Sequence, residues 1–304
     1  MWAVRRSLIS VSILLVLACT PPHLRCEDVQ QYLRDEYVGK TLIVRGFYLD
    51  DELDFDSAGS PVGRRIPGDW TIAGLVRVSE IDLKDSHLMI KARRVTVISD
   101  GRVLQVRLAE DVATRRDQDK DIFVKIRASI ANDNPSAEQV VLMMGKIFLT
   151  GQDRLGALVP QYWKPCVSGG PGGRPTCRFS DELLQVPGFS NRDSESSVEN
   201  LEPLRNPPRV FHRGDGVTPP KLIHHRDPEY NERGRKEKCQ GSLTIQFIVG
   251  EDGLATDIHV LKPLGCGLDA QAVAAVQQWK FKPAEKDRQP VPVQIETEED
   301  FHLY

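Results

Sequence analysis

Six cysteines are the residues of this sequence whose type and spacing first suggest chemistry: Cys19, Cys26, Cys166, Cys177, Cys239 and Cys266. The chain lacks the CxxC pair of many zinc and thiol redox sites, so we expect no metal on these cysteines. Cys166 and Cys177 enclose a loop rich in Gly and Pro, which favours a local disulfide. Cys239 with Cys266 is the second predicted pair, which leaves Cys26 over once Cys19, at the N-terminal processing site, is set aside. The alternative is that both pairs are separate small residues.

Three histidines, His212, His224 and His225, are the other candidate metal ligands. Adjacent histidines diverge on most backbones, and no carboxylate at a suitable spacing supports them, so we expect no metal site. The acidic run of Asp50, Asp51, Glu52, Asp54 and Asp56 lacks the Asx-Gly-Glu arrangement of a calcium-binding EF-hand loop, which favours a solvated loop. No GxSxG, HExxH, phosphate-loop or dinucleotide motif is present. The sequence therefore predicts no catalytic residue and no cofactor.

Length and charge restrict the class of protein further. A chain of 304 residues is long for one core and predicts about two domains. The net charge of -3 provides no basic surface for nucleic acid, so we expect no nucleic-acid partner.

The first 18 residues have the pattern of a secretory signal peptide. Two arginines precede an almost wholly apolar run from Leu8 to Ala18, which is too short for a comfortable membrane span. The following Cys19 completes a segment similar to a bacterial lipobox, which predicts lipidation of Cys19 and a membrane anchor. Ordinary cleavage to a soluble periplasmic protein and retention as an uncleaved anchor are the two alternatives. Secretion places the cysteines in an oxidising compartment.

Residues 28–150 read as a mostly-β domain with flanking helices. Helices are predicted at 28–37 and 136–148, the second after the start signal Asn134-Pro135-Ser136. β-branched runs between them predict strands at 41–49, 70–78, 88–90, 94–98, 103–108 and 122–130. Residues 151–216 contain most of the Gly and Pro punctuation and read as a loop-rich connector and linker. Trp70 and Trp163 could line a ligand groove, but we expect them in the core.

Residues 217–304 form the third predicted region, with the order helix, strand, strand, helix, strand. Asp227-Pro228 predicts a helix start, and GSLTIQFIVG, from Gly241, alternates as a strand with one core face. Asp252-Gly253 predicts a tight turn into the returning strand. A second helix follows Gly267, and Pro290 to Phe301 reads as the final strand.

These segments resemble the C-terminal domain of the TonB family in order and spacing. The resemblance rests on Pro228 and Tyr230, Gly241, Asp252-Gly253, Leu268-Asp269, Ala272, Val276 and the string WKFKPA at 279–284. It implies an α+β fold for 217–304, an envelope location in a Gram-negative-type bacterium, and no enzymatic activity. It further implies β-strand addition, in which a sheet edge accepts an extended segment of an envelope or outer-membrane protein, such as a TonB-dependent transporter.

The resemblance implies that the final strand, Val291 to Phe301, is the binding edge. Val291, Val293 and Ile295 alternate as core residues, so the outward Gln294, Glu296 and Glu298 are the partner-binding candidates. Exposed charges also discourage aggregation at an edge, and the two roles stay open. Strand exchange would also allow a homodimer.

Force transmission is not expected, because transducing members of this family keep a membrane helix that this sequence lacks. The rival interpretation places a ligand-binding or enzymatic activity in residues 28–150, with the terminal domain as a docking module.

Overall fold

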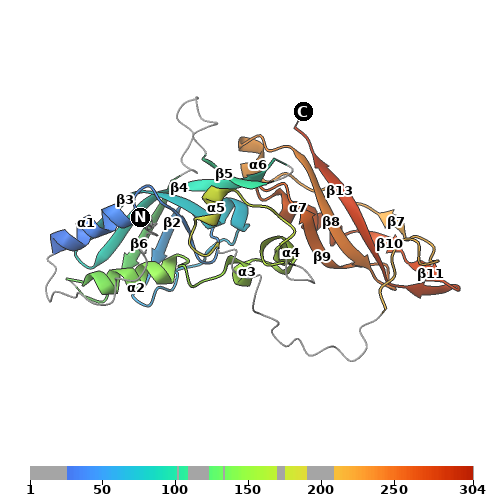
Figure 1. The fold of residues 1–304 in the computed structure, drawn as a ribbon, viewed down its shortest axis with the longest axis horizontal. Helices are drawn as coiled ribbons and strands as arrows, with labels where there is room; N and C mark the ends of the chain where they lie inside the picture. The colour runs from blue at the N-terminus through green and yellow to red at the C-terminus, as the bar shows by residue number, and fades with distance from the viewer. Residues whose placement is uncertain are drawn as a thin grey trace, which may run out of the picture.

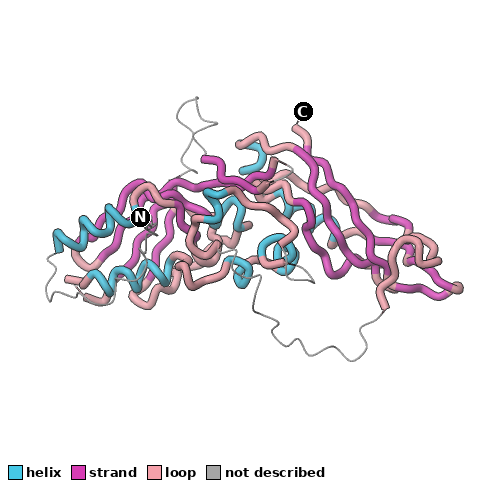
Figure 2. The backbone as a smooth tube through the Cα atoms, in the orientation of Figure 1, coloured by secondary structure: helices cyan, strands magenta, loops and turns pink. Residues whose placement is uncertain are grey.

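The computed structural model describes residues 26–100, 103–108, 123–132, 134–169, 175–189 and 209–303. Within these ranges the chain folds into two sheet-containing halves, one before residue 190 and one after residue 208, which lie side by side (Figure 1). Both halves combine helices with strands, so the predicted α+β class is confirmed. Strands dominate the first half, as predicted (Figure 2).

A six-stranded sheet is the centre of the first half. Its order is β1-β3-β4-β6-β2, and β5 pairs with β4 outside this path. β-branched residues are frequent in these strands and suit a pleated, half-buried surface. The strands are β1 (Thr41–Ile43), β2 (Glu52–Phe55), β3 (Leu75–Lys84), β4 (His87–Ser99), β5 (Leu104–Leu108) and β6 (Phe123–Ser129).

Two helices share one buried core with this sheet. Helices α1 (Cys26–Tyr37) and α2 (Ala137–Ile147) lie within two residues of their predicted bounds. Ser136 caps α2 with a reciprocal pair of hydrogen bonds, because its hydroxyl accepts from the Gln139 N–H while the Gln139 side chain accepts from the Ser136 N–H. Val29 and Leu33 of α1 and Val140 and Ile147 of α2 pack against the strands.

A second core lies between the sheet and residues 155–189, where sequence periodicity predicted only loops. Short helical segments there bury Leu155, Trp163, Leu183 and Phe189. Trp163 packs edge-on against Trp70 with ring centroids 5.2 Å apart, which confirms both tryptophans as core residues. The segments are α3 (Leu155–Leu158), the 3-10 turn η4 (Gln161–Trp163), α4 (Lys164–Val167) and α5 (Asp181–Leu184).

The predicted strand at 70–78 is wrong in its first half. Residues Trp70–Gly74 form a π-helical turn, η1, and the strand begins only at Leu75. The Asp69 carboxylate caps this turn by accepting hydrogen bonds from the Thr71 N–H at 2.9 Å and from its hydroxyl at 2.5 Å. This local side-chain capping competes successfully with strand pairing.

The second half contains a three-stranded antiparallel sheet in the order β13-β8-β9. Helix α7 packs its buried residues Leu268, Ala272 and Val276 into a core with the sheet. The main elements are α6 (Glu232–Lys236), β8 (Gly241–Val249), β9 (Ala255–Lys262), α7 (Leu268–Val276) and β13 (Val293–Phe301).

Two smaller ladders complete this half, β7 (Lys221–His224) with β10 (Lys280–Lys282) and β11 (Ala284–Lys286) with β12 (Gln289–Val291). Two predicted bounds were wrong. The helix expected after Asp227-Pro228 begins after Asn231, whose side chain accepts from the Gly234 N–H at 2.6 Å. The final strand is divided between β12 and β13 at Pro292, which has no N–H to donate to a ladder.

Candidate functional site

Strand β13 is an edge of the C-terminal sheet. It pairs with β8 along its whole length, from Val293 opposite Val249 to Phe301 opposite Gly241. No other named strand among the described residues pairs with its outer side. The outer side is therefore the place where an extended segment could add to this sheet.

The chain itself occupies the first part of that outer side. The Phe211 N–H donates to the Pro292 carbonyl at 3.0 Å, and the Gln294 N–H donates to the Phe211 carbonyl at 2.9 Å, as in a parallel bridge to Val293. The Asp215 N–H then donates to the His212 carbonyl in a turn, and the chain leaves the edge. Residues 295–301 lie beyond this contact.

The Phe211 contact fixes which main-chain groups of β13 point outward. The N–H and C=O of one residue in a strand point to the same side, and the side alternates along the strand. Because the Gln294 N–H points outward, so do the main-chain groups of Glu296, Glu298 and Asp300. Within the described residues no main-chain hydrogen bond reaches these three outward positions.

The side chains of β13 alternate in step with its main-chain groups. Val293 and Phe301 are buried, and Ile295 is partly buried against the same core, as is Val291 of β12. The even-numbered side chains from Gln294 to Asp300 lie on the opposite face. Val293, Ile295 and Phe301 at odd positions thus face the core, whereas Glu296, Glu298 and Asp300 at even positions present both unbonded main-chain groups and exposed side chains.

The three partner-binding candidates lie in one row on that face. Gln294 is half-buried, and its main chain is engaged by Phe211. Glu296 is exposed and accepts from the Gln246 side chain on β8 at 2.9 Å, and Glu298 is exposed. The sequence analysis missed Asp300, which continues the row, and Phe211, which lies far earlier in the chain than its bridge partner Val293 and gives no local signal.

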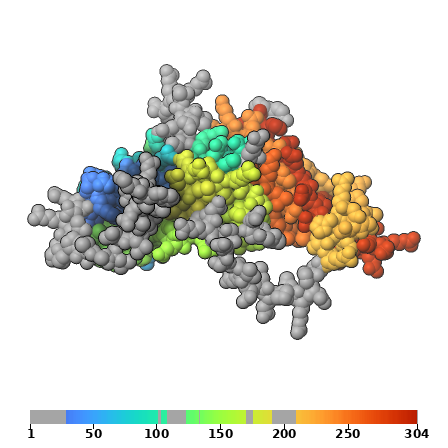
Figure 3. Space-filling model, in the orientation of Figure 1, coloured from blue at the N-terminus to red at the C-terminus, as the bar shows by residue number. Residues whose placement is uncertain are grey.

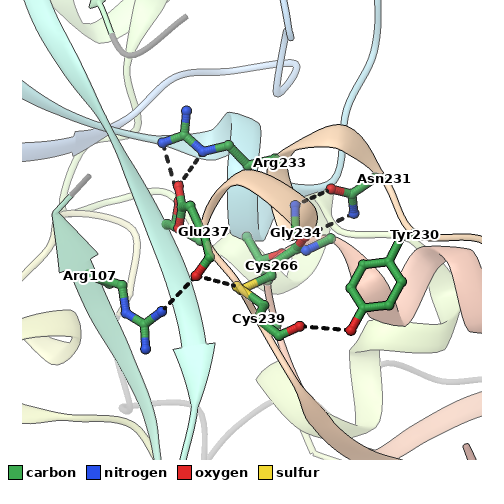
Figure 4. Close-up of a disulfide and its surroundings, with 12 residues drawn as sticks. Arg107, Tyr230, Asn231, Arg233, Gly234, Glu237, Cys239 and Cys266 are labelled. Atoms are coloured by element: carbon green, nitrogen blue, oxygen red, sulfur yellow. Dashed lines mark hydrogen bonds and ion pairs between the residues drawn. A yellow bond between two sulfur atoms is a disulfide. The ribbon is translucent and has the colours of Figure 1, made fainter. Parts of the chain in front are cut away.

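A disulfide between Cys239 and Cys266 lies in the core of this half and confirms the predicted pair (Figure 4). Its surroundings are held by side chains of the 230–239 segment. The Tyr230 hydroxyl donates to the Cys239 carbonyl at 3.0 Å, and the Asn231 side chain donates to the Cys266 carbonyl at 2.9 Å. The other predicted pair, Cys166 with Cys177, is also joined.

The loop at 264–267, which carries Cys266, forms a main-chain joint between the two halves. The Cys266 N–H donates to the Val97 carbonyl at 2.8 Å, and the Ser99 N–H donates to the Leu264 carbonyl at 2.9 Å, so the loop extends the β4 ladder. The Gly267 N–H donates to the Thr71 hydroxyl at 2.8 Å. The yellow-green segment around 155–189, which belongs to the first half, also lies against the second half (Figure 3).

A polar cluster beside the disulfide adds to this joint. The Thr96 hydroxyl of β4 donates to the Glu237 carboxylate at 2.7 Å, and Arg233 forms an ion pair with the same carboxylate. Arg107 of β5 donates to the Glu237 carbonyl at 3.4 Å (Figure 4). Thr96 and Arg107 belong to the first half and Glu237 to the second, so directed polar contacts cross between the halves beside a largely buried ion pair.

Comparison with known proteins settles what the second half is. A family model described as the Gram-negative bacterial TonB protein C-terminal matches residues 226–303. This segment is a TonB C-terminal domain. The solution NMR structure of the Pseudomonas aeruginosa TonB C-terminal domain is similar to it, with 20% sequence identity over 31% of this chain and 94% of that chain, at a TM-score of 0.25. No curated protein matches the chain.

The TonB C-terminal domain is a protein-interaction domain of the Gram-negative envelope and carries no enzymatic activity of its own. No helix within the described ranges is long and apolar enough to cross a membrane. The predicted signal peptide and Cys19 lie outside the described residues.

A buried carboxylate, Asp269, and a half-buried one, Asp69, lie where the TonB C-terminal domain meets the first half. Asp269 accepts from the Leu264 and Gly265 N–H groups at 2.8 and 2.7 Å, and Asp69 accepts from the Trp163 indole at 3.0 Å. Burial raises the pKa of Asp269 to about 7, and the charge of Asp69 adds to this rise, while the two N–H donors oppose it. Burial likewise raises the pKa of Asp69. These carboxylates serve the joint, because each fixes a turn beside the interface.

The histidine candidates do not come together in the structure. His212 lies near Asp215, and His225 near Asp227, each within its own turn. In the described part of the chain, the group with metal-ligand distances is Glu237 with Cys239 and Cys266. The two sulfurs of that group are bonded to each other and offer no thiolate to a metal.

Proposed function

We propose that this chain is an envelope protein whose TonB C-terminal domain binds an extended segment of another envelope or outer-membrane protein by strand addition. The carrying observation is the set of outward main-chain groups at Glu296, Glu298 and Asp300, which no described residue bonds. Main-chain hydrogen bonds would supply affinity, and the alternate side chains would supply selectivity. A TonB-dependent transporter is a candidate for this partner, because proteins of the TonB family bind such transporters.

The proposed location in the cell envelope rests on the TonB C-terminal domain and on the signal peptide predicted from the sequence. Secretion through the signal peptide would place both disulfides in the periplasm, and acylation of Cys19 would anchor the chain to a membrane. Mass spectrometry of the mature N-terminus tests this part separately. A lipid-modified Cys19 is expected, and an intact Met1 would contradict it.

The first half would hold the TonB C-terminal domain in a fixed orientation. The extension of the β4 ladder by the 264–267 loop and the Glu237 cluster fix the domain on a sheet that has its own two cores. A partner strand would therefore meet an edge with a defined orientation.

A single proline tests the main-chain mechanism. Glu298→Pro removes an outward N–H, leaves the ladder to β8 intact, and is tolerated on an edge strand. Glu298→Ala is the matched control, because it removes the same side chain and keeps the N–H. After cross-linking in cells and purification of the full chain, Glu298→Pro should lose partners that Glu298→Ala retains. Equal capture by both variants would contradict strand addition.

A further inference from the structure

The free part of the β13 edge is strongly acidic. Strand β13 carries Glu296, Glu298, Glu299 and Asp300 among nine residues and has no Lys or Arg. Three of these four, at the even positions, have exposed side chains beside the outward main-chain groups. No described cation forms an ion pair with any of the three.

Cations lie beside the segment that occupies the first part of the same edge. The segment around Phe211 that pairs with β13 contains Arg209, whose guanidinium lies 4.9 Å from the centre of the Phe211 ring. The ammonium group of Lys286 lies 4.6 Å from the same ring centre. Within the described residues, the extended segment that pairs with this edge therefore carries a cation, Arg209. The unoccupied positions from Glu296 to Asp300 have no such counterpart.

From this charge pattern we infer that the partner segment is basic, with Lys or Arg at every second position. The inference rests on the proposed strand addition. Residues of an added strand that share the face of Glu296, Glu298 and Asp300 recur at i, i+2 and i+4, so three cations would lie opposite three carboxylates. A single cation, or cations on consecutive residues, would not match the row.

The same charges disfavour a second copy of this strand as the occupant. Two β13 edges pairing with each other would bring acidic rows against one another, and like charges directly opposite are destabilising. The homodimer by strand exchange is therefore a competing outcome of the experiment and not the expected one.

Three labelled octapeptides test the inference on the full oxidised chain by fluorescence anisotropy. They alternate Val with Lys, Gln or Glu, so that the strand propensity is shared and only the charge changes. The test variant is Glu296→Gln with Glu298→Gln and Asp300→Asn. The matched control, Glu80→Gln with Glu138→Gln and Glu251→Gln, removes the same charge from exposed positions elsewhere.

The Lys peptide should bind wild type and control about tenfold more tightly than the Gln peptide at low salt, from three modest cross-strand charge pairs. This preference should vanish in the test variant and shrink at high salt. Glu298→Pro should abolish binding of both peptides.

Each remaining outcome separates the two proposals. Equal binding of Lys and Gln peptides would overturn the basic-partner inference and leave strand addition standing. Binding of no peptide would refute both for this edge. Lys-peptide binding that survives Glu298→Pro would show charge attraction without strand addition, which also overturns the inference. A wild-type dimer in sedimentation that the test variant strengthens would identify a second copy as the occupant.

Discussion

Removing the Cys239–Cys266 disulfide should lower the free energy of unfolding and should also loosen the contact between the two halves. The bond closes a loop with a sequence separation of 27 residues. The loop-entropy relation assigns about 3.5 kcal/mol at 25 °C to a loop of that size. The Cys166–Cys177 bond, with a separation of 11, is assigned about 2.8 kcal/mol by the same relation. The two bonds thus differ little in this respect, and they form a matched pair of perturbations.

Their positions differ much more than their loop lengths. Cys266 donates its N–H to Val97 in the other half, whereas Cys166 is buried in the core of the first half. We therefore expect Cys239→Ser with Cys266→Ser to loosen the hydrogen bonds between the 264–267 loop and β4. Cys166→Ser with Cys177→Ser should leave those hydrogen bonds closed, although α4, which carries Cys166, also packs against β9. Hydrogen exchange at the amides of Ser99 and position 266 reports on the joint directly.

Guanidinium unfolding followed by circular dichroism gives the free energies, and native-state hydrogen exchange gives the opening of the joint. The expected result is a loss of about 3 kcal/mol in each double variant, with faster exchange at the joint in the Cys239/Cys266 variant alone. Equal exchange at the joint in both variants would refute the reasoning, because the disulfide would then play no part in holding the halves together.

Three further predictions follow from the same contacts. The raised pKa of Asp269, about 7 in the folded chain against 3.8 for the ordinary group, makes its contribution to stability largest below about pH 4 and lost as pH rises through 7. Urea unfolding from pH 4 to 8 should show this decline, and Asp269→Asn should reduce it; an unchanged slope would disprove the assignment. Thr297→Pro should destabilise the fold by about 3 kcal/mol, because the N–H of Thr297 points toward β8, while Glu298→Pro should cost much less; equal thermal shifts would contradict the assigned alternation. Phe211→Ala should cost about 3 kcal/mol, because the ring is buried, and without that ring the segment whose main-chain carbonyl holds the Gln294 N–H should leave the edge, so that this amide exchanges faster; a Gln294 amide that stays protected would show that the ring does not anchor the segment.

Local patterns predicted the elements whose causes are local. The alternation from Gly241 to Val249 and the apolar stripe of α7 correspond to β8 and to the second helix of the TonB C-terminal domain. Both disulfides were also predicted, because each closes a short stretch of chain.

Elements that depend on distant residues could not be predicted in this way. The strand expected at 41–49 is continuous only over Thr41–Ile43, with isolated bridges at Val44 and Tyr48, because Gly46 and Phe47 adopt positive φ values of 84° and 48°. The η1 turn depends on Asp69, which is in turn held by the Trp163 indole 94 residues later. Contacts over such separations leave no trace in hydrophobic periodicity.

In the candidate site, too, residues with a local pattern were predicted and residues that depend on distant contacts were not. Gln294, Glu296 and Glu298 were placed on one face by alternation alone, and the structure shows them in one row. The seated Phe211 and the joint at 264–267 were not foreseen, since both arise from backbone pairing between segments with no complementary sequence pattern.

The strict alternation of β13 also bears on how this protein can change. Substitutions at even positions can retune the choice of partner while the core stays fixed, so specificity and stability are free to vary separately. A one-residue insertion or deletion would instead exchange the two sets of positions at once, placing acids in the core and apolar side chains on the surface. The length of this strand should therefore be far less tolerant of change than its composition.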